Sequence, residues 1–284
     1  MRTERLHHNN ARTPALFDGK SGRTFRVCFG TTDMGSAMSK RTENNMQDTF
    51  PNQDDLFRTD PDLASMYQRL VSKQPSGCSL DKRQRHLVPL VALVALHGTD
   101  ALRRCTQSAL EDGVRPVEIR EAVYQCTPYV GFSMTEHALQ YVNSVFKAHG
   151  LSLPLESQTT VCEENRFQNG LAVQKRIFGD VIDTMHASTP EDQKTLVVEH
   201  LSAFCFGDIY TRTGLDLRTR ELLTFAVISA LGGCDCQVRS HVQGNANVGN
   251  NKRQLVDVLE LLLPLMGFPR TLNALACINA VMAE

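Results

Sequence analysis

The pattern of apolar and polar positions divides the chain into a patternless start and a long helical remainder. From Asp60 onward, apolar residues recur three and four positions apart, which is the spacing of one helix face. Asp60 followed by Pro61 is typical of a helix start, with proline at the first helical position. Alternating runs are scarce, and no Asn-Gly or Asp-Gly hairpin turn joins two β-branched segments. The pattern therefore predicts an all-α protein.

A second pattern is an internal repeat. Residues 80–87 and 215–222 share a leucine, an aspartate, two arginines and a final leucine in the same order. Beyond Thr99 the match continues with an offset that is larger by one residue. The later matching pairs are Gly113 and Gly249, Pro128 and Pro264, Gly131-Phe132 and Gly267-Phe268, Thr135 and Thr271, Ala138 and Ala274, Leu139 and Leu275, Asn143 and Asn279, and Val145 and Val281. A single slip over the whole match is what a duplicated unit predicts.

Each copy is expected to contain four helices. A long apolar helix comes first, and in the second copy Gly232-Gly233 is expected to end it by supplying a left-handed residue. A shorter polar helix ends at Gly113 or Gly249, a third follows, and a Pro-x-x-Gly-Phe turn leads into the last. The expected ranges of the apolar, third and last helices are 87–96, 116–124 and 135–147 in the first copy and 222–231, 252–263 and 271–282 in the second. The third helix of the second copy is apolar on several faces, so we expect close packing between copies and between subunits.

Composition excludes several classes of function. The chain has 30 Lys and Arg against 31 Asp and Glu, a net charge of -1, which argues against a nucleic-acid partner held by a basic face. No run of about 18 apolar residues is present, so no membrane partner is expected. The first ten residues lack the apolar segment of a secretory signal. With that start, the odd number of nine cysteines favours reduced thiols and a cytoplasmic location.

Three regions are predicted from these patterns. Residues 1–55 are polar and have no sustained period, so a disordered or poorly packed N-terminal extension is expected. Alternatively the chain starts at Met34, Met38 or Met46, or the early arginines form an organelle leader. Residues 56–150 are predicted to form a first domain with a degenerate site. Residues 151–284 are predicted to contain linker helices and a second domain with the active site.

Four segments of the second copy share a family resemblance. They are Gly214 to Leu223, Arg239 to Val242, Asn247 to Gly249 and Gly267 to Leu275, and Phe206 to Tyr210 leads into the first of them. Together with the repeat, they make about residues 60–284 resemble the carboxymuconolactone decarboxylase-like, or alkylhydroperoxidase D-like, family as two tandem domains. The resemblance implies an all-α fold of two closely packed domains and a small-molecule substrate. It also implies a homo-oligomer, a trimer of tandem chains that mimics a hexamer.

Glu221 and His241 form the first candidate catalytic pair. In the family an acidic residue on the long helix faces a histidine on the next helix, and here a Gly-Gly turn separates the two. A carboxylate hydrogen-bonded to an imidazole fixes its tautomer and makes it a better proton acceptor. The pair could instead be structural, or Glu221 could pair with Arg218 or Arg220.

Cys234 and Cys236 form the second candidate site. With Asp235 as the N-cap, Cys236 falls in the first turn of a helix, where the helix N-terminus lowers the pKa of a thiol. The family's peroxidases use Cys-x-x-Cys with the histidine four residues later, whereas here the spacing is Cys-x-Cys and then five. A Cys-x-Cys disulfide would form a tight, strained and oxidising ring. The two cysteines are therefore either a redox site or two small loop residues.

The first copy lacks this constellation. His86 and Cys105 stand where Glu221 and His241 stand in the second copy. The site is therefore absent from the first copy, or the two residues form a different nucleophile–base pair.

No metal and no cofactor are expected. The Cys-x-Cys segment with His241 has zinc-binding residue types, but its spacing matches no standard site and a fourth ligand is missing. The chain contains no G-x-G-x-x-G loop after a strand, no Walker pattern and no H-E-x-x-H.

Arg239 and Arg270 are candidate substrate-binding residues, because a guanidinium fork binds a carboxylate through two hydrogen bonds. Each could instead be a surface or interface ion-pair residue. The family's decarboxylase usually has an arginine soon after the His-Val pair, where this chain has Gln243.

Three functions remain open. We favour a decarboxylase-like enzyme that uses Glu221 and His241 on a small carboxylated lactone or related acid. The alternative is an antioxidant thiol-dependent alkyl hydroperoxidase, in which Cys236 attacks, Cys234 resolves and the Glu/His pair relays protons. The third is a non-catalytic binding or scaffold member of the family.

Overall fold

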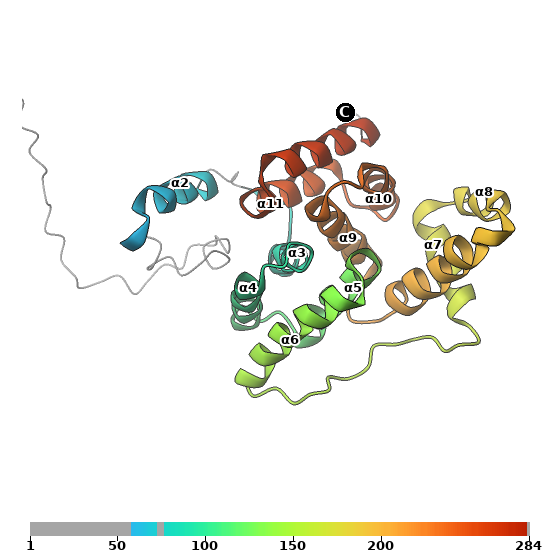
Figure 1. Ribbon diagram of the computed structural model, residues 1–284, viewed down its shortest axis with the longest axis horizontal. Coiled ribbons are helices and arrows are strands. Elements are labelled where there is room, and N and C mark those ends of the chain that lie inside the picture. The colour runs from blue at the N-terminus through green and yellow to red at the C-terminus, as the bar shows by residue number, and fades with distance from the viewer. Residues whose placement is uncertain (1–57, 73–76, 283–284) are drawn as a thin grey trace, which may run out of the picture. The chain divides into compact units, whose positions relative to one another are not determined.

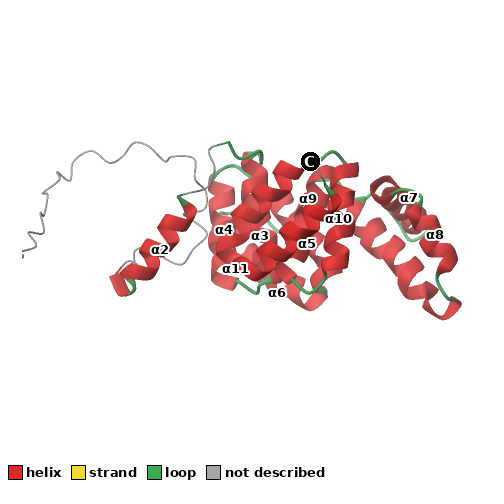
Figure 2. Cartoon of the chain, turned by 90° about the horizontal axis from the view of Figure 1, so that it is seen from above, coloured by secondary structure: helices red, strands yellow, loops and turns green. Residues whose placement is uncertain are grey.

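The computed structural model of the protein describes residues 58–72 and 77–282. Within these residues the chain is helical and contains no strand (Figure 1, Figure 2). The predicted all-α fold is confirmed. The extension predicted over residues 1–55 lies outside the described residues, and the domain boundaries at 56–150 and 151–284 stay a prediction.

The repeat predicted from the sequence is present in the helices. Gly131 (φ 82°, ψ 165°) separates the last two helices of the first copy, and Gly267 (φ 74°, ψ 173°) breaks α11 at the equivalent place. α11 therefore comprises the third and the last helix of the second copy. The first copy contains α3 (Lys82–Ala95), α4 (Thr99–Glu111), α5 (Pro116–Val130) and α6 (Phe132–Ala148), and the second contains α9 (Leu217–Leu231), α10 (Asp235–Asn247) and α11 (Lys252–Val281).

The helix starts follow from side-chain caps. Asp81 accepts a hydrogen bond from the N–H of Gln84 at 2.7 Å and begins α3, and Asp216 does the same for α9. Asn251 begins α11 through a capping box with Gln254. Such caps occupy N–H groups that have no partner inside the helix. Asp60 precedes α2 (Pro61–Val71) with proline at its first position, as predicted.

α3 and α9 lie at the centre of the two copies. Figure 1 shows them between α5 and α11, and the helix contacts agree. Both are buried along most of their length. α5 of the first copy packs against α9, and α11 of the second packs against α3. Each copy therefore covers the central helix of the other, so the predicted close packing of the copies is confirmed.

The chain reversals differ from the prediction in two details. Pro128 and Pro264 were expected in turns, but α5 continues to Val130 and the first part of α11 to Met266. In α5 the turn after the proline still closes, because the N–H of Gly131 donates to Thr127 O at 2.9 Å. Gly232 has a positive φ of 73°, but its ψ of 165° is extended and not left-handed helical. This region of backbone space is essentially restricted to glycine.

A second group of helices precedes the second copy. It contains α7 (Arg166–Phe178), α8 (Val181–Ser188), the short 3₁₀-helix η2 (Glu191–Gln193) and the π-helix η3 (Thr195–Tyr210). α7 and η3 approach closely because each has a glycine where it meets the backbone of the other helix. A Cβ on Gly170 of α7 would clash with Ser202 O, and a Cβ on Gly207 of η3 would clash with Arg166 O. η3 ends at Tyr210, which is buried next to α9.

One helix among the described residues, α11, is long and apolar enough to cross a membrane by length and composition. Gly267 breaks this helix, and its first part contributes Leu255, Val258 and Leu262 to the core.

Candidate active site

Glu221 and His241 are in contact. Glu221 lies near the start of α9 and His241 in the middle of α10, and the Gly232-Gly233 turn folds the two helices into a hairpin. His241 Nδ1 is 2.9 Å from Glu221 Oε2, and the side chains are 9% and 0% exposed. A carboxylate that accepts from Nδ1–H leaves the lone pair on Nε2. The predicted pair is therefore formed, and its geometry suits proton transfer.

The second oxygen of Glu221 binds a tyrosine. Tyr210 donates its hydroxyl to Glu221 Oε1 at 2.7 Å and lies 2.7 Å from Thr224 Oγ1. Tyr129 extends the cluster, with its hydroxyl 2.9 Å from that of Tyr210. Both oxygens of the buried carboxylate therefore have partners, which a buried acid requires.

The tyrosines remain neutral donors. Burial raises the pKa of Tyr210 and of Tyr129 well above the ordinary value, and the nearby Glu221 adds to the shift. Cys205 lies in the same cluster, where burial raises its pKa to about 12 and a hydrogen bond with Tyr129 opposes the shift. A neutral phenol can orient a carboxylate without adding a charge to the site.

Aromatic rings enclose the imidazole. The rings of Phe178 and Tyr129 meet His241 edge-on, with centroids 5.4 Å and 5.8 Å away. Phe178 also contacts Phe206, which packs on Tyr210. α7, η3 and the first copy's α5 thus form the walls around a pair that the second copy supplies.

Two adjacent residues of α10, a glycine and an asparagine, allow and stabilise the close contact between α9 and α10. Asn245 donates to the backbone oxygens of Glu221 at 3.0 Å and of His241 at 2.7 Å. A Cβ on Gly244 would lie 2.6 Å from Glu221 Oε2, so α10 can approach the carboxylate only where a side chain is absent.

A buried polar chain joins this cluster to the first copy. Gln125 on α5 donates to Thr224 Oγ1 at 3.1 Å and accepts from Arg220 Nη1 at 2.9 Å. Arg220 also binds Glu121 at 3.1 Å, and both side chains are fully buried. The Glu221 site therefore depends on residues from both copies.

The two predicted redox cysteines lie apart from the pair. Cys234, and not Asp235, is the N-cap of α10, and Cys236 is exposed in the first turn. Within the described residues, neither thiol forms a hydrogen bond with the Glu/His pair. Cys234 donates to Ile228 O at 3.3 Å. Burial and then Asp235 raise its pKa.

The two predicted substrate arginines lie at the far end of the hairpin. Arg270 begins the second part of α11 and lines a cavity beside Gly232 and Asp235. Arg239 is exposed on α10. The cavity lies at the end of α9, two helical turns or about 10 Å from Glu221. The structure therefore does not bring these arginines to the Glu/His pair.

In the first copy His86, at the position of Glu221, pairs with a residue that is not the equivalent of His241. His86 Nε2 is 2.7 Å from Asp112 Oδ2, and Lys82 lies 3.2 Å from the other oxygen. Burial lowers the pKa of His86, while Asp112 acts against that shift. In the first copy, therefore, a buried histidine binds a partly exposed aspartate that also forms an ion pair with a lysine. The expected degeneration of this copy and the alternative His86–Cys105 pair stay predictions.

Sequence reasoning missed the residues that surround Glu221. Tyr210 had a signal, because it ends the Phe206 to Tyr210 segment that leads into the family's long helix. Tyr129, Thr224 and Gln125 had none, since they meet only through packing of the two copies. No group of three or more His, Cys, Asp and Glu side chains within residues 58–72 and 77–282 could hold a metal ion.

Comparison with known proteins identifies relatives. Residues 61–144 and 196–280 match the Carboxymuconolactone decarboxylase family. A 4-carboxymuconolactone decarboxylase from Acinetobacter baylyi is 30% identical over 97 residues, which are 34% of this chain and 72% of the relative. An uncharacterized 15.0 kDa protein encoded in the nqo9-nqo10 intergenic region of Paracoccus denitrificans is 26% identical over 110 residues, 38% of this chain and 82% of the relative.

Proposed function

The chain belongs to the carboxymuconolactone decarboxylase family, and we propose that it is an enzyme whose Glu221–His241 pair performs acid–base chemistry on a small carboxylated lactone or related acid. One observation supports this proposal above the others. The Nδ1–Oε2 contact of 2.9 Å joins two almost completely buried groups, and Tyr210 satisfies the remaining carboxylate oxygen. An imidazole oriented in this way can take up a proton at Nε2 and, as the imidazolium, deliver it from there.

The proposed reaction is a decarboxylation. The bond between the substrate's carboxylate and its carbon breaks, CO2 leaves, and the electron pair moves onto a carbon conjugated with the lactone carbonyl. His241 first takes a proton from water at Nε2, and the resulting imidazolium delivers that proton to the carbon, while Glu221 holds the ring through Nδ1. One carboxylate and one proton yield CO2 and a C–H bond, with no oxidant or reductant.

The similarity to a 4-carboxymuconolactone decarboxylase supports this substrate class. The peroxidase alternative has weaker support. It needs a thiol linked to the proton relay, but Cys234 bonds a backbone oxygen and its pKa is raised by burial. Cys236 is accessible, so the alternative is tested in parallel.

The decisive experiment measures CO2 release from a panel of carboxylated γ-lactones, with 4-carboxymuconolactone first. We expect turnover by the unchanged protein, loss of turnover in Glu221→Gln, and retention in Cys234→Ala and Cys236→Ala. Dithiol-dependent reduction of an organic hydroperoxide that disappears in Cys236→Ser, without CO2 release, would replace this proposal by the peroxidase. Absence of both activities in folded protein would favour a non-catalytic role.

We also propose that the protein works as a homo-oligomer, as a trimer of tandem chains, in the cytoplasm. Phe132 and Phe268, which occupy equivalent positions of the two copies, are 71% and 61% exposed, and Leu272 is 55% exposed. Large exposed apolar side chains of this kind often lie in interfaces. Light scattering of the purified chain should give three times the monomer mass, and a monomer would refute the assembly.

A further inference from the structure

The second copy contains a cavity that is separate from the Glu/His pair. It has a volume of about 190 Å³ and lies where the end of α9, the start of α10 and the second part of α11 meet. Its walls include Ile228, Ser229, Asp235, Val238, Arg270 and Asn273. For scale, an apolar cavity of about 150 Å³ can bind benzene. The cavity can therefore hold one small organic molecule.

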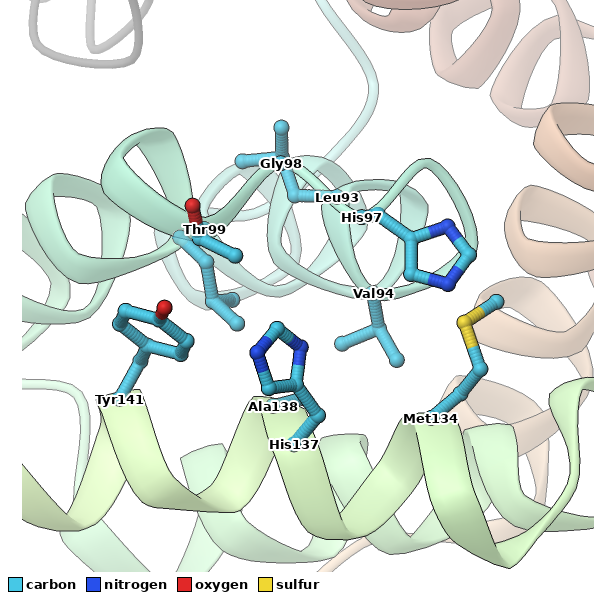
Figure 3. Close-up of a pocket in the computed structure, with 10 residues that line it drawn as sticks. Leu93, Val94, His97, Gly98, Thr99, Met134, His137, Ala138 and Tyr141 are labelled. Atoms are coloured by element: carbon cyan, nitrogen blue, oxygen red, sulfur yellow. The ribbon is translucent and has the colours of Figure 1, made fainter.

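The same place in the first copy is almost filled. Figure 3 shows the equivalent pocket between α6 and the α3–α4 turn, and its volume is only about 10 Å³. Met134 and His137 stand there at the positions of Arg270 and Asn273, and Val94 stands at that of Ser229. The larger cavity therefore accompanies different side chains and an α9–α10 connection that, counted between equivalent positions, has one residue more than the α3–α4 connection.

One polar group in the cavity lacks a partner. Ser229 is 3% exposed and lines the cavity, yet its hydroxyl forms no hydrogen bond within the part of the chain that the structure describes. A buried hydroxyl without a partner is unfavourable, and most buried polar groups are satisfied. A hydrogen-bonding ligand in the cavity would satisfy it.

The edge of the cavity also carries opposite charges, on the exposed Arg270 and the partly buried Asp235, that do not pair with one another. Among residues 58–72 and 77–282, neither the Arg270 guanidinium nor the Asp235 carboxylate forms an ion pair or a side-chain hydrogen bond. The Arg270 side chain crosses Gly232, where a Cβ would lie 3.0 Å from its Nε. Gly232 thereby leaves room for the arginine beside the cavity. The nearby Arg239 forms no ion pair with Asp235 either.

We propose that this cavity binds a small α-amino or α-hydroxy acid. The ligand's carboxylate lies against Arg270 and the Ser229 hydroxyl, and the amino or hydroxyl group on its neighbouring carbon donates to Asp235. A short branched side chain fills the space between Ile228 and Val238. Guanidinium groups bind carboxylates through two hydrogen bonds, and a donor facing Asp235 balances the negative charge that would otherwise repel an acid.

This site does not depend on the proposed decarboxylase activity. The cavity lies about 10 Å along α9 from Glu221, and among the described residues none of those lining it forms a side-chain hydrogen bond with the Glu/His pair. Its binding can therefore be measured whether or not the protein releases CO2.

The test is calorimetric titration of the full-length protein with four probes of matched shape. L-valine and 2-hydroxy-3-methylbutanoate carry both the acid and the donor, 3-methylbutanoate carries only the acid, and 2-methylpropylamine carries only the amine. We expect one or both of the first two to bind with a dissociation constant on the order of 1 mM. The two single-function probes should bind at least roughly ten-fold more weakly.

Three variants each replace one residue of the cavity wall by the residue at the equivalent position of the first copy. Arg270→Met, Asp235→Thr and Ser229→Val introduce the residues found at Met134, Thr99 and Val94, so the helices should tolerate them. Each should weaken binding by roughly ten-fold or more. Arg69→Met, which removes an exposed arginine of α2, is the matched control and should bind like the unchanged protein.

Three results would overturn the proposal. The first is no saturable binding of L-valine or the hydroxy acid to folded protein. The second is binding that persists unchanged in Arg270→Met and Ser229→Val. The third is binding that is as tight for 3-methylbutanoate as for the two-function probes. Thermal melting of each variant shows that it is folded, so a loss of binding is assigned to the cavity.

Discussion

Glu221 in the second copy and His86 in the first occupy the same place on equivalent helices, but their surroundings differ. Glu221 is completely buried and binds His241 and Tyr210. His86 binds Asp112, whose side chain is 28% exposed and also pairs with a lysine. The first arrangement is almost completely buried and suits proton transfer, whereas the second is an ion-pair network that reaches the surface.

The difference shows how a duplicated fold separates scaffold from chemistry. Apolar positions of α3 and α9 are buried alike, because each copy covers the other's central helix. A few polar positions decide what each copy can do. Thr224 binds Tyr210 in α9, whereas the equivalent position in α3 is Pro89, which has no hydroxyl to offer.

The largest expected effect comes from removing the histidine of the second copy. His241→Cys introduces the residue found at Cys105 and should lower kcat/KM for CO2 release by roughly 10²–10⁴-fold, because the proton donor is lost. Cys105→Ala in the first copy should leave kcat/KM unchanged. Equal losses in both variants would show that the copies share the chemistry, and steady-state kinetics on folded proteins distinguishes these outcomes.

The next effect concerns the carboxylates that stand at equivalent positions in α5 and α11. Glu121→Gln leaves the fully buried Arg220 with one charged partner fewer, so the free energy of unfolding should fall by about 3–5 kcal/mol. Asp257→Asn, by contrast, weakens contacts with Ser79 and the half-exposed Arg253 and should lower it by about 1–3 kcal/mol. Denaturant unfolding measures the loss of unfolding free energy in both variants. A larger loss in Asp257→Asn than in Glu121→Gln would contradict the prediction.

A smaller effect is expected from the tyrosines. Tyr210→Phe leaves Glu221 Oε1 without its donor and should lower the free energy of unfolding by about 1–3 kcal/mol. Tyr129→Phe removes the bonds to the Tyr210 hydroxyl and the Cys205 thiol, neither of which is charged, and should lower it by about 0.5–1.5 kcal/mol. If Tyr210→Phe leaves stability unchanged but alters the pH profile of CO2 release, the hydroxyl orients the pair without stabilising the fold.

The smallest effect is a pH dependence that distinguishes two equivalent arginines. Arg83 binds the carboxylates of Glu118 and Asp216, whereas Arg218 binds the amides of Asn250 and Gln254. Burial acts to raise the pKa of Glu118 and of Asp216. Their hydrogen bonds, including those from Arg83, outweigh burial, so both pKa values lie below the ordinary ones.

Ionised carboxylates with lowered pKa values favour the folded chain. Their stabilisation is complete above the unfolded-state pKa values, 4.5 for Glu118 and 3.8 for Asp216. It is lost as the pH falls through the lower folded-state values. Arg83→Gln should therefore flatten the decline of stability below about pH 4.5, whereas Arg218→Gln should not. Denaturant unfolding at several pH values between neutral and acid compares the two variants. The same decline of stability with falling pH in both variants would contradict the role given to Arg83.

Much of the fold could be predicted because it depends on local patterns. The periodic apolar residues, the Asp60-Pro61 start and the matching glycines indicated the helices and the two copies. The helix ends were less predictable, since Pro128 lies in the last turn of α5 and Gly131, three residues later, reverses the chain. A proline marks a weakened helix, but whether the helix continues depends on the hydrogen bonds that remain.

The candidate site was predicted only in part. The family resemblance implied that Glu221 faces His241, and the glycine turn between their two helices made a hairpin the expected way to bring them together. Tyr129 lies 81 residues before Tyr210 in the chain, and the contact of their hydroxyls requires the first copy to pack on the second. Arg270 was assigned to a substrate from its residue type alone, and its place beside the cavity depends on the break at Gly267.

The amino-acid sequence by itself determined the helices, the duplication and the family, because helix periodicity, caps and repeated residues are local or directly comparable along the chain. Only the tertiary structure decided which polar groups meet. The closure of the Glu221 site by Tyr210 and Tyr129, the buried Arg220–Glu121 contact and the open cavity of the second copy all arise between helices distant in sequence. Their energies depend on burial and distance, which a linear pattern does not contain.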